Sequence, residues 1–399
     1  WPFSMPPQIE DESDINLGFY HQSNIGLLKH VYRKGLKVRY GPTMQCVSGM
    51  HYNFSINPDS LAFLTNSNHQ VDIDEAYLGL IRNFKRLFWF VLLEFGQTNV
   101  VDKSFVNNRE HKLEKLNSND MYLLDATSLR MSDIGYQSKA QKNLNIKYNS
   151  LSGFLKKIKD AITVPYKDFE ALGLLDSNDE YHQISNGIIQ IENEYYDAIR
   201  PKRSSLNGLR PYNLLKEYGI EYLEVRGVDL LPDDITGTSV HHMQFLDIIL
   251  IYCLIDQSPK ISDDEKEKID LNDSKVIYKG RDKDTNIDKN NRVVNINEAR
   301  NEIIDDLKLV ASFFENSESF IESIEYVIGS VKGKIPDNSF HSDGVKKAKE
   351  NIKILRSNGS LNLDGIKKEA ELSLNKLKEI PENTNDEMNE FVKNYNLKL

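Results

Sequence analysis

The chain lacks a cysteine framework, a long hydrophobic run and an excess of positive charge. Its two cysteines, Cys46 and Cys253, lie far apart in apolar runs, which argues against a disulfide scaffold and fits a reducing compartment. The longest apolar runs, at residues 87–95 and 245–255, are shorter than the about 20 residues of a transmembrane helix. The 399 residues carry a net charge of −10, which argues against a nucleic-acid-binding surface. We therefore expect a cytoplasmic protein that binds neither membranes nor nucleic acid; nothing in the sequence indicates its oligomeric state.

The residue pattern divides the chain into three parts. Residues 1–257 are rich in aromatic and short apolar segments, with alternating strand patterns and helices between them, such as residues 74–90. Residues 258–292 are rich in charge, and we expect a loop or poorly ordered connection there, with one short strand at 276–278. In residues 293–399 the apolar positions recur at helical spacing. This order predicts an α+β fold with antiparallel strands in the first part and a helical C-terminal region.

A strand pattern at residues 44–56 has an unusual row of polar side chains. Alternation places one set of small or polar residues on the same face, namely Gln45, Gly49, His51, Asn53 and Ser55. A face exposed only for solubility would usually contain lysine or glutamate, so we interpret this one as the floor of a site. His51 alone is a weak signal, because a single histidine on a strand is more often structural than a metal ligand.

A second strand pattern, at residues 219–230, places a carboxylate beside a guanidinium. Glu224 and Arg226 are two residues apart and therefore point the same way. They form either a surface ion pair, or a metal-binding carboxylate next to an arginine that neutralises a phosphoryl group. Phosphoryl transfer uses the second arrangement, because the metal holds the phosphate oxygens while a fixed cation stabilises the charge that develops.

Residues 190–203 join an acidic run to a compact basic loop. We expect the run to be strand-like, and Pro201 stiffens the loop. The polar residues are Gln190, Glu192 and Glu194 on one side of the run, followed by Arg200, Lys202 and Arg203 in the loop. Acids followed closely by a rigid basic loop suit a magnesium–nucleotide site, although an ordinary charged turn has the same pattern.

Two further arginines stand in settings that suit a small anion. Arg130 lies between two apolar residues, so its side chain is either paired inward or binds an anion such as a substrate carboxylate. Tyr32 and Arg33 form an aromatic–arginine pair ahead of the strand that contains His51. The alternatives are core packing for the tyrosine and a solvated helix face for the arginine.

Taken together and in this order, six segments resemble the proteobacterial type of the glutamate–cysteine ligase family. They cover most of residues 1–257 and read WPFSMPP, YRKGLKVRYG, SGMHYNFS, ATSLRMSDIGY, QIENEYY with IRPKR, and GIEYLEVRGVD. This family is similar in fold to glutamine synthetase. The resemblance therefore implies a curved antiparallel sheet flanked by helices, with divalent metals and ATP on its concave face.

The resemblance also implies roles for the side chains of the two strands and the basic loop. His51 and Glu224 would be metal ligands. Glu224 and Arg226 would be catalytic, and Arg226 would contact the phosphoryl group in transfer. The nucleotide would lie near the basic loop, at Arg200, Lys202 and Arg203.

The implied reaction is the ATP-dependent ligation of cysteine to the γ-carboxylate of glutamate through a γ-glutamyl phosphate, the first step of glutathione synthesis. Arg33 and Arg130 would hold substrate carboxylates, and Tyr32 and Tyr136 would line the pocket for the cysteine side chain. Magnesium would be the metal, with manganese as a second candidate because a histidine is among the ligands. The alternatives are a ligase with another amine acceptor and a non-catalytic remnant of the fold.

The beginning of the chain bears on the metal site. The family has a Gly-x-Glu-x-Glu-type segment upstream of the first motif, and this segment supplies further metal carboxylates. Because the chain opens on Trp1 rather than on a methionine, we expect further residues before it, and a metal site that is incomplete as given.

Overall fold

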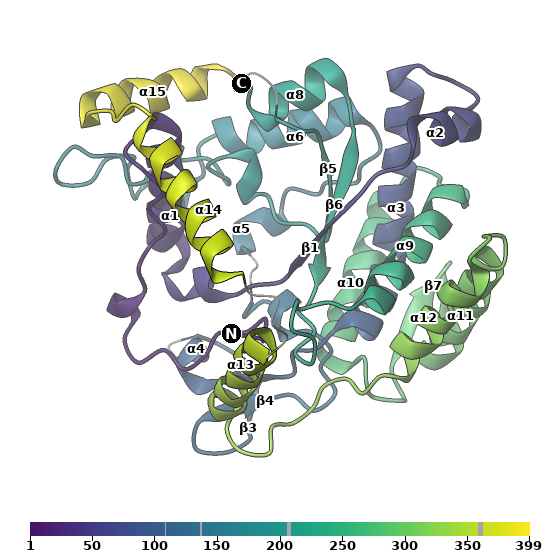
Figure 1. The fold of residues 1–399 in the computed structure, drawn as a ribbon. Helices are drawn as coiled ribbons and strands as arrows, with labels where there is room; N and C mark the ends of the chain where they lie inside the picture. Colours follow the sequence, from purple (N-terminus) through teal and green to yellow (C-terminus); the bar gives the residue numbers. More distant parts are fainter. Residues whose placement is uncertain (108, 136–137, 206–208, 358–361) are drawn as a thin grey trace.

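The fold is that of a computed structural model, which describes residues 1–399 except 108, 136–137, 206–208 and 358–361 (Figure 1). The strands are β1 (Met50–Phe54), β2 (Val100–Asp102), β3 (Glu114–Lys115), β4 (Asp120–Tyr122), β5 (Ile199–Lys202), β6 (Tyr222–Val228), β7 (Asn286–Lys289) and β8 (Arg292–Asn295). The helices of the first part are α1 (Asn24–Tyr40), α2 (Pro58–Thr65), α3 (Gln70–Phe95), α4 (Lys103–Val106), α5 (Lys139–Lys142), α6 (Leu151–Thr163), α7 (Lys167–Glu170), α8 (Pro211–Tyr218) and α9 (Val240–Ile255). The later helices are α10 (Asp263–Lys279), α11 (Ile296–Ala311), α12 (Ser317–Gly329), α13 (Phe340–Ser357), α14 (Leu363–Lys378) and α15 (Asn385–Leu397).

A three-stranded antiparallel sheet, in the order β1–β6–β5, lies at the centre of the molecule. Its register pairs Glu224 with Asn53 on β1 and with Arg200 on β5, so these three side chains lie across one face. Along β6 the residues of this face, including Glu224 and Arg226, are partly exposed, whereas the residues between them are buried. We call this partly exposed side of the sheet the polar face.

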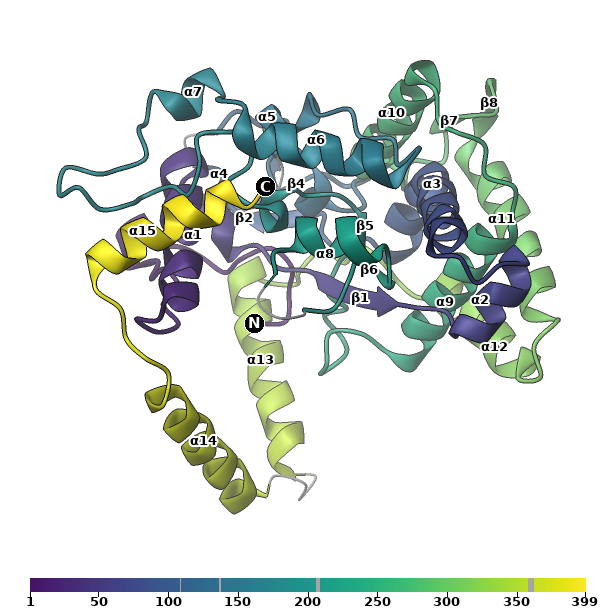
Figure 2. The same ribbon diagram turned by 90° about the horizontal axis from the view of Figure 1, so that it is seen from above.

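The opposite side of the sheet packs against α3, which α9 and α10 in turn cover (Figures 1 and 2). The residues of α3 are buried along most of its length, as expected for a helix that is apolar on nearly all sides. Gly227 of β6 shows how closely the two layers approach, because a Cβ atom there would lie 2.3 Å from the ring of Phe88. A glycine is therefore required at this point of contact.

The C-terminal helices are attached to this core in part through a buried ion cluster. Glu94, near the end of α3, is 0% exposed and contacts both Arg300 of α11 and Lys332, whose Nζ lies 2.7 Å from Oε2. Helix α15 packs against α1, and α13 packs against β2. Figure 2 shows α13 and α14 extending away from the rest of the molecule.

The α+β class, the antiparallel sheet and the helical C-terminal region are confirmed, but the prediction for residues 258–292 was wrong. Residues 263–279 of this stretch, including 276–278, form the helix α10, and the β7–β8 hairpin follows it. Ser262 caps the helix by accepting a hydrogen bond from the Glu265 backbone N–H, and acids occupy the first turn, where the helix dipole favours them. Because most of its residues are charged or polar, the sequence pattern did not indicate the narrow apolar face of the helix, which includes the buried Ile269 and Val276.

Two strand predictions also need correction. Residues 190–194 are not strand-like, because Glu192–Glu194 form a single 3-10 turn, η4. The strand predicted at 44–56 is limited to β1, since Thr43–Cys46 form another 3-10 turn, η2. Among the described residues, no helix combines the length and the apolar character that crossing a bilayer requires.

Candidate functional site

On the polar face, four basic side chains surround one carboxylate. Arg200 Nη2 lies 2.6 Å from Glu224 Oε2, and Lys202 Nζ lies 3.8 Å from Oε1. Arg226 Nε lies 3.8 Å from Oε2, and His51 Nδ1 lies 3.7 Å from Oε1. We call these five residues the Glu224 cluster. The structure thus brings together five of the predicted site residues, from three strands that are far apart in the sequence.

The charges of the cluster keep Glu224 ionised. Burial raises the pKa of its carboxyl, but Arg200, Lys202 and Arg226 outweigh burial and hold the pKa below its usual range. Burial lowers the pKa of Lys202, and the two arginines lower it further against the attraction of Glu224. Burial also lowers the pKa of His51, and Arg226 acts in the same direction, so this imidazole is neutral at neutral pH.

The cluster has the properties of an anion-binding site. Two arginines and a lysine face a single carboxylate, so the net charge is positive. The side chain of His51, at the edge, is 50% exposed, which leaves the cluster open to solvent. Guanidinium groups present planar sets of donors that match phosphate and carboxylate oxygens, and a lysine adds a point charge. The arrangement therefore suits a multiply charged anion such as a chain of phosphates.

Arg130 is buried beneath the cluster and is paired inward, which was the first of its two predicted alternatives. Its Nε donates to Asp229 Oδ1 at 2.7 Å, and Nη1 donates to the Tyr196 hydroxyl at 3.0 Å. Its Nη2 donates to the carbonyl of Arg226 at 3.2 Å. Arg130 is 3% exposed, and it contacts the cluster through the backbone of Arg226. Its role as a ligand of a substrate carboxylate stays a prediction.

Sequence reasoning missed two residues that organise this region. Asp229, 4% exposed, accepts hydrogen bonds from Arg130, from two hydroxyl groups (Thr98 and Ser128) and from the backbone N–H of Gln97. Tyr196 accepts a hydrogen bond from Arg130, and the guanidinium of Arg226 lies 5.2 Å above its ring. The only signal was the position of each residue inside a recognised motif, since neither contact follows from alternation.

The described contacts of the remaining predicted residues do not join them to the Glu224 cluster. Arg33 Nη2 donates to the Tyr20 hydroxyl at 2.7 Å, and the backbone carbonyl of Tyr32 accepts a hydrogen bond from Gln190. Arg203 donates to the carbonyls of Tyr218 and Gly219 at the end of α8. Tyr136 lies outside the described residues.

Two side chains of the cluster have the chemistry of metal ligands. His51 Nδ1 and Glu224 Oε1 are 3.7 Å apart, a spacing that one ion could bridge. However, Arg226 Nε lies 3.2 Å from the other ring nitrogen of His51, and in the part of the chain that the structure describes no group of three or more His, Cys, Asp or Glu residues could hold a metal. The pair therefore fits a magnesium site in which the protein provides one or two ligands, and phosphate oxygens and water molecules provide the others.

Known proteins of one family are similar to this chain in sequence. Residues 1–276 match the family described as glutamate–cysteine ligase. The glutamate–cysteine ligase of Pseudomonas savastanoi pv. phaseolicola is 37% identical over 345 residues, which is 85% of this chain and 64% of the relative. That of Hahella chejuensis is 41% identical over 292 residues, which is 72% of this chain and 55% of the relative. The chain thus spans less than two thirds of the length of either relative.

A solved structure extends the similarity to the whole fold. The crystal structure of glutamate–cysteine ligase from Francisella tularensis in complex with AMP matches with a TM-score of 0.90 and 29% identity. The match covers 100% of this chain and 82% of the other. By sequence and by fold, the chain belongs to the glutamate–cysteine ligase family.

Proposed function

We propose that the protein containing this chain joins L-cysteine to the γ-carboxylate of L-glutamate at the expense of ATP, the first step of glutathione synthesis. The observation that carries the proposal is the Glu224 cluster, where three cations lie around one carboxylate on an open sheet face. Family membership supports the choice of substrates. The AMP complex of the Francisella relative supports a nucleotide as one of them.

The reaction has two steps. A γ-carboxylate oxygen of glutamate attacks the terminal phosphorus of ATP, the bond from phosphorus to the bridging oxygen breaks, and ADP leaves. The amine of cysteine then attacks the carbonyl carbon of the acyl phosphate, loses a proton and displaces phosphate. Both steps move negative charge onto phosphate oxygens, so the protein has to provide fixed positive charge at that place.

In this proposal the cluster residues have distinct roles. Arg226 contacts the phosphoryl group in transfer, and Arg200 and Lys202 hold the nucleotide phosphates from β5. Glu224 and His51 would hold magnesium, or manganese given the imidazole, and the bound ion would neutralise phosphate charge.

The substrate contacts are proposed from the family resemblance. Arg33 and Arg130 would hold carboxylates, and Tyr32 and Tyr136 would line the pocket for the cysteine side chain. Arg203 is proposed to assist nucleotide binding.

The test measures ADP release by the full-length protein supplied with ATP, magnesium, glutamate and cysteine. Release should require both amino acids, and Glu224→Gln should lower kcat by about 10²–10³-fold, the usual effect of losing one charge-stabilising group. The matched control is Glu221→Gln, an exposed acid three residues earlier on the same segment, and it should retain turnover. Faster turnover with another amine would indicate a different ligase, and no ADP release with any amine would indicate a non-catalytic remnant.

A further inference from the structure

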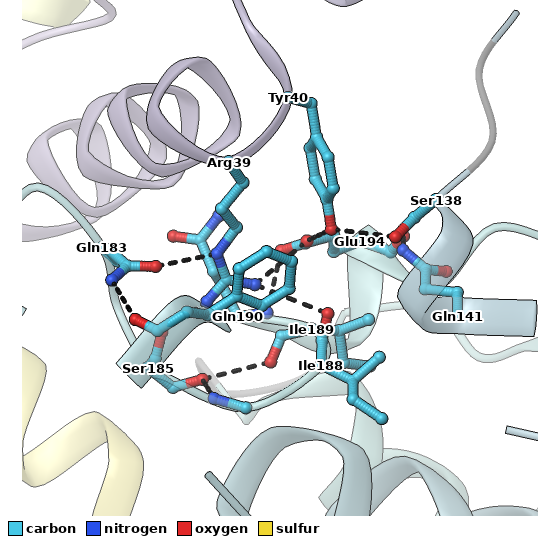
Figure 3. A network of polar contacts seen from close by, with 12 residues as sticks. Arg39, Tyr40, Ser138, Gln141, Gln183, Ser185, Ile188, Ile189, Gln190 and Glu194 are labelled. Atoms are coloured by element: carbon cyan, nitrogen blue, oxygen red, sulfur yellow. Dashed lines mark hydrogen bonds and ion pairs between the residues drawn. The ribbon is translucent and has the colours of Figure 1, made fainter. Parts of the chain in front are cut away.

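A fully buried ion pair fixes the end of helix α1 to turn η4 (Figure 3). The side chains of Arg39 and Glu194 are 0% and 1% exposed, and Nη1 lies 3.3 Å from Oε1. The Tyr40 hydroxyl donates to the same oxygen at 3.1 Å, and the backbone N–H of Gln190 donates to Oε2 at 2.8 Å. Both carboxylate oxygens are therefore occupied, and the turn is joined to α1 by two side chains.

The other acid of turn η4 is held in a similar way. Glu192 accepts two parallel hydrogen bonds from Arg210, at 2.9 Å from Nε and 3.0 Å from Nη2. This bidentate geometry fixes the direction of both groups. Arg210 itself donates to the carbonyl of Tyr395 in α15. The turn is thus held from two sides by buried arginines.

Turn η4, fixed by these two ion pairs, orients the side chain of Arg200. Arg200 Nη1 donates to the carbonyls of Glu192 and Asn193 at 3.4 Å each, and to that of Tyr195 at 2.8 Å. Its Nη2 points the other way and contacts Glu224 at 2.6 Å. Its buried Nε has no hydrogen-bond partner among the described residues. The carbonyls of the turn and of the adjacent Tyr195 therefore hold one end of this guanidinium, and Glu224 holds the other.

The same turn also leads to Arg226. Gln141 donates to the carbonyl of Glu194 at 3.1 Å and accepts from the backbone N–H of Tyr196 at 2.9 Å. The ring of Tyr196 lies under the guanidinium of Arg226. Two cations of the Glu224 cluster are thus aligned by one turn.

We propose that the Arg39–Glu194 pair is a positioning device for the cations of the Glu224 cluster, acting through turn η4. An apolar pair would fill the same space at similar or better stability, but it would leave the direction of the carbonyls unfixed. Neither residue needs to touch a substrate. The inference deepens the proposed function and rests on it, because the cations matter for catalysis only if phosphoryl transfer takes place there.

The test compares Glu194→Gln with Glu94→Gln in the full-length protein. Both changes remove a buried carboxylate that has cationic partners, and both should destabilise the fold, but Glu94 pairs with Arg300 and Lys332 away from the cluster. Measured on folded protein, Glu194→Gln should lower kcat by about 10²-fold, the effect of a small displacement of a catalytic group. Glu94→Gln should leave kcat at the wild-type value. Equal effects of the two changes on kcat would overturn the proposal.

A milder variant and a structure keep the proposal testable if Glu194→Gln does not fold. Tyr40→Phe removes only the hydroxyl that donates to Glu194, and it should lower kcat less than Glu194→Gln but more than Glu94→Gln does. A crystal structure of Glu194→Gln, or of Tyr40→Phe if Glu194→Gln does not fold, should show the Arg200 side chain displaced from Glu224. An undisplaced Arg200 overturns the proposal whether or not the protein is active. Absence of wild-type turnover, in contrast, counts against the proposed function alone.

Discussion

Glu224 and Glu94 are two carboxylates with very different surroundings. Glu94 is 0% exposed and lies between α3 and α11, where Arg300 and Lys332 contact it. Glu224 is surrounded by Arg200, Lys202 and Arg226, and its side chain is 12% exposed beside the half-exposed His51. Both carboxylates are outnumbered by positive charge. The cations of the two clusters are exposed to a similar extent. The difference lies in the carboxylate, because Glu94 is sealed from solvent, whereas solvent reaches Glu224 and the half-exposed His51 beside it.

The largest expected effect is at the fully buried Glu94. Glu94→Gln leaves two partly buried cations, Arg300 and Lys332, without their shared counter-ion, and we expect the free energy of unfolding to fall by about 3–5 kcal/mol. Urea unfolding of the variant and the wild type measures this difference. A loss of stability under about 1 kcal/mol would mean that water solvates the two cations in the variant. Glu94 would then not differ from Glu224 in its contribution to stability.

The second effect is on the accessible cluster. Lys202→Met removes a cation whose pKa is lowered by burial and by its two arginine neighbours, so the change relieves repulsion and should leave the melting temperature unchanged or raised. The KM for ATP should rise by about 10–100-fold, equivalent to the about 1.5–3 kcal/mol of a charged hydrogen bond.

Arg203→Met is the matched comparison for Lys202→Met. Sequence analysis placed both residues near the nucleotide, but Arg203 donates to carbonyls at the end of α8. Arg203→Met should therefore change the KM for ATP less than Lys202→Met does. A larger effect at Arg203 would favour the sequence-based assignment over the observed contacts.

The smallest expected effect is at a third carboxyl group, that of Asp273, which lies in a cavity. Asp273 lines a cavity of about 410 Å³ together with Lys85, and its Oδ1 has no hydrogen-bond partner among the described residues. Burial raises its pKa to about 8, with Lys85 opposing the shift and Asp270 adding to it. The folded state therefore holds a proton between about pH 4 and pH 8 that the unfolded state releases. The contribution of Asp273 to the free energy of unfolding is therefore fully present below about pH 4 and is lost as the pH rises through about 8.

Asp273→Asn should remove this pH dependence. At pH 9 we expect the variant to be more stable than the wild type by about 1–3 kcal/mol, the usual penalty of an unsatisfied buried polar group. The difference should shrink towards pH 5, and thermal unfolding at several pH values measures it. Asp264→Asn is the control, because Asp264 is an exposed acid on the same helix and is not among the groups that shift the pKa of Asp273. A variant that is less stable at pH 9 would show that Asp273 is paired.

The polar face of the sheet was largely predictable, and the contacts beneath it were not. Alternation places Glu224 and Arg226 on one face of a strand, and the motif order pointed to His51 as their neighbour. Alternation also places Asp229 on the other face, and says nothing of its bond to Arg130, which is 99 positions away in the sequence. Long-range pairs of this kind depend on how loops pack, which a local pattern does not encode.

The failures in secondary structure have a related cause. Helix α10 was predicted as a loop because its charged residues outnumber the few apolar ones, and tertiary packing against α3 decides its conformation. Turn η4 was predicted as a strand because its acids alternate with other residues. In the fold, each acid instead binds a distant arginine.

The contact of Gly227 with Phe88 links the hidden side of the sheet to its exposed one. A single methyl group at this position would overlap the ring of Phe88, so the strand and the helix would have to move apart. Glu224 and Arg226 lie on that same strand and would move with it. A substitution of Gly227 is therefore expected to disturb the alignment of Glu224 and Arg226 on the far side of the sheet.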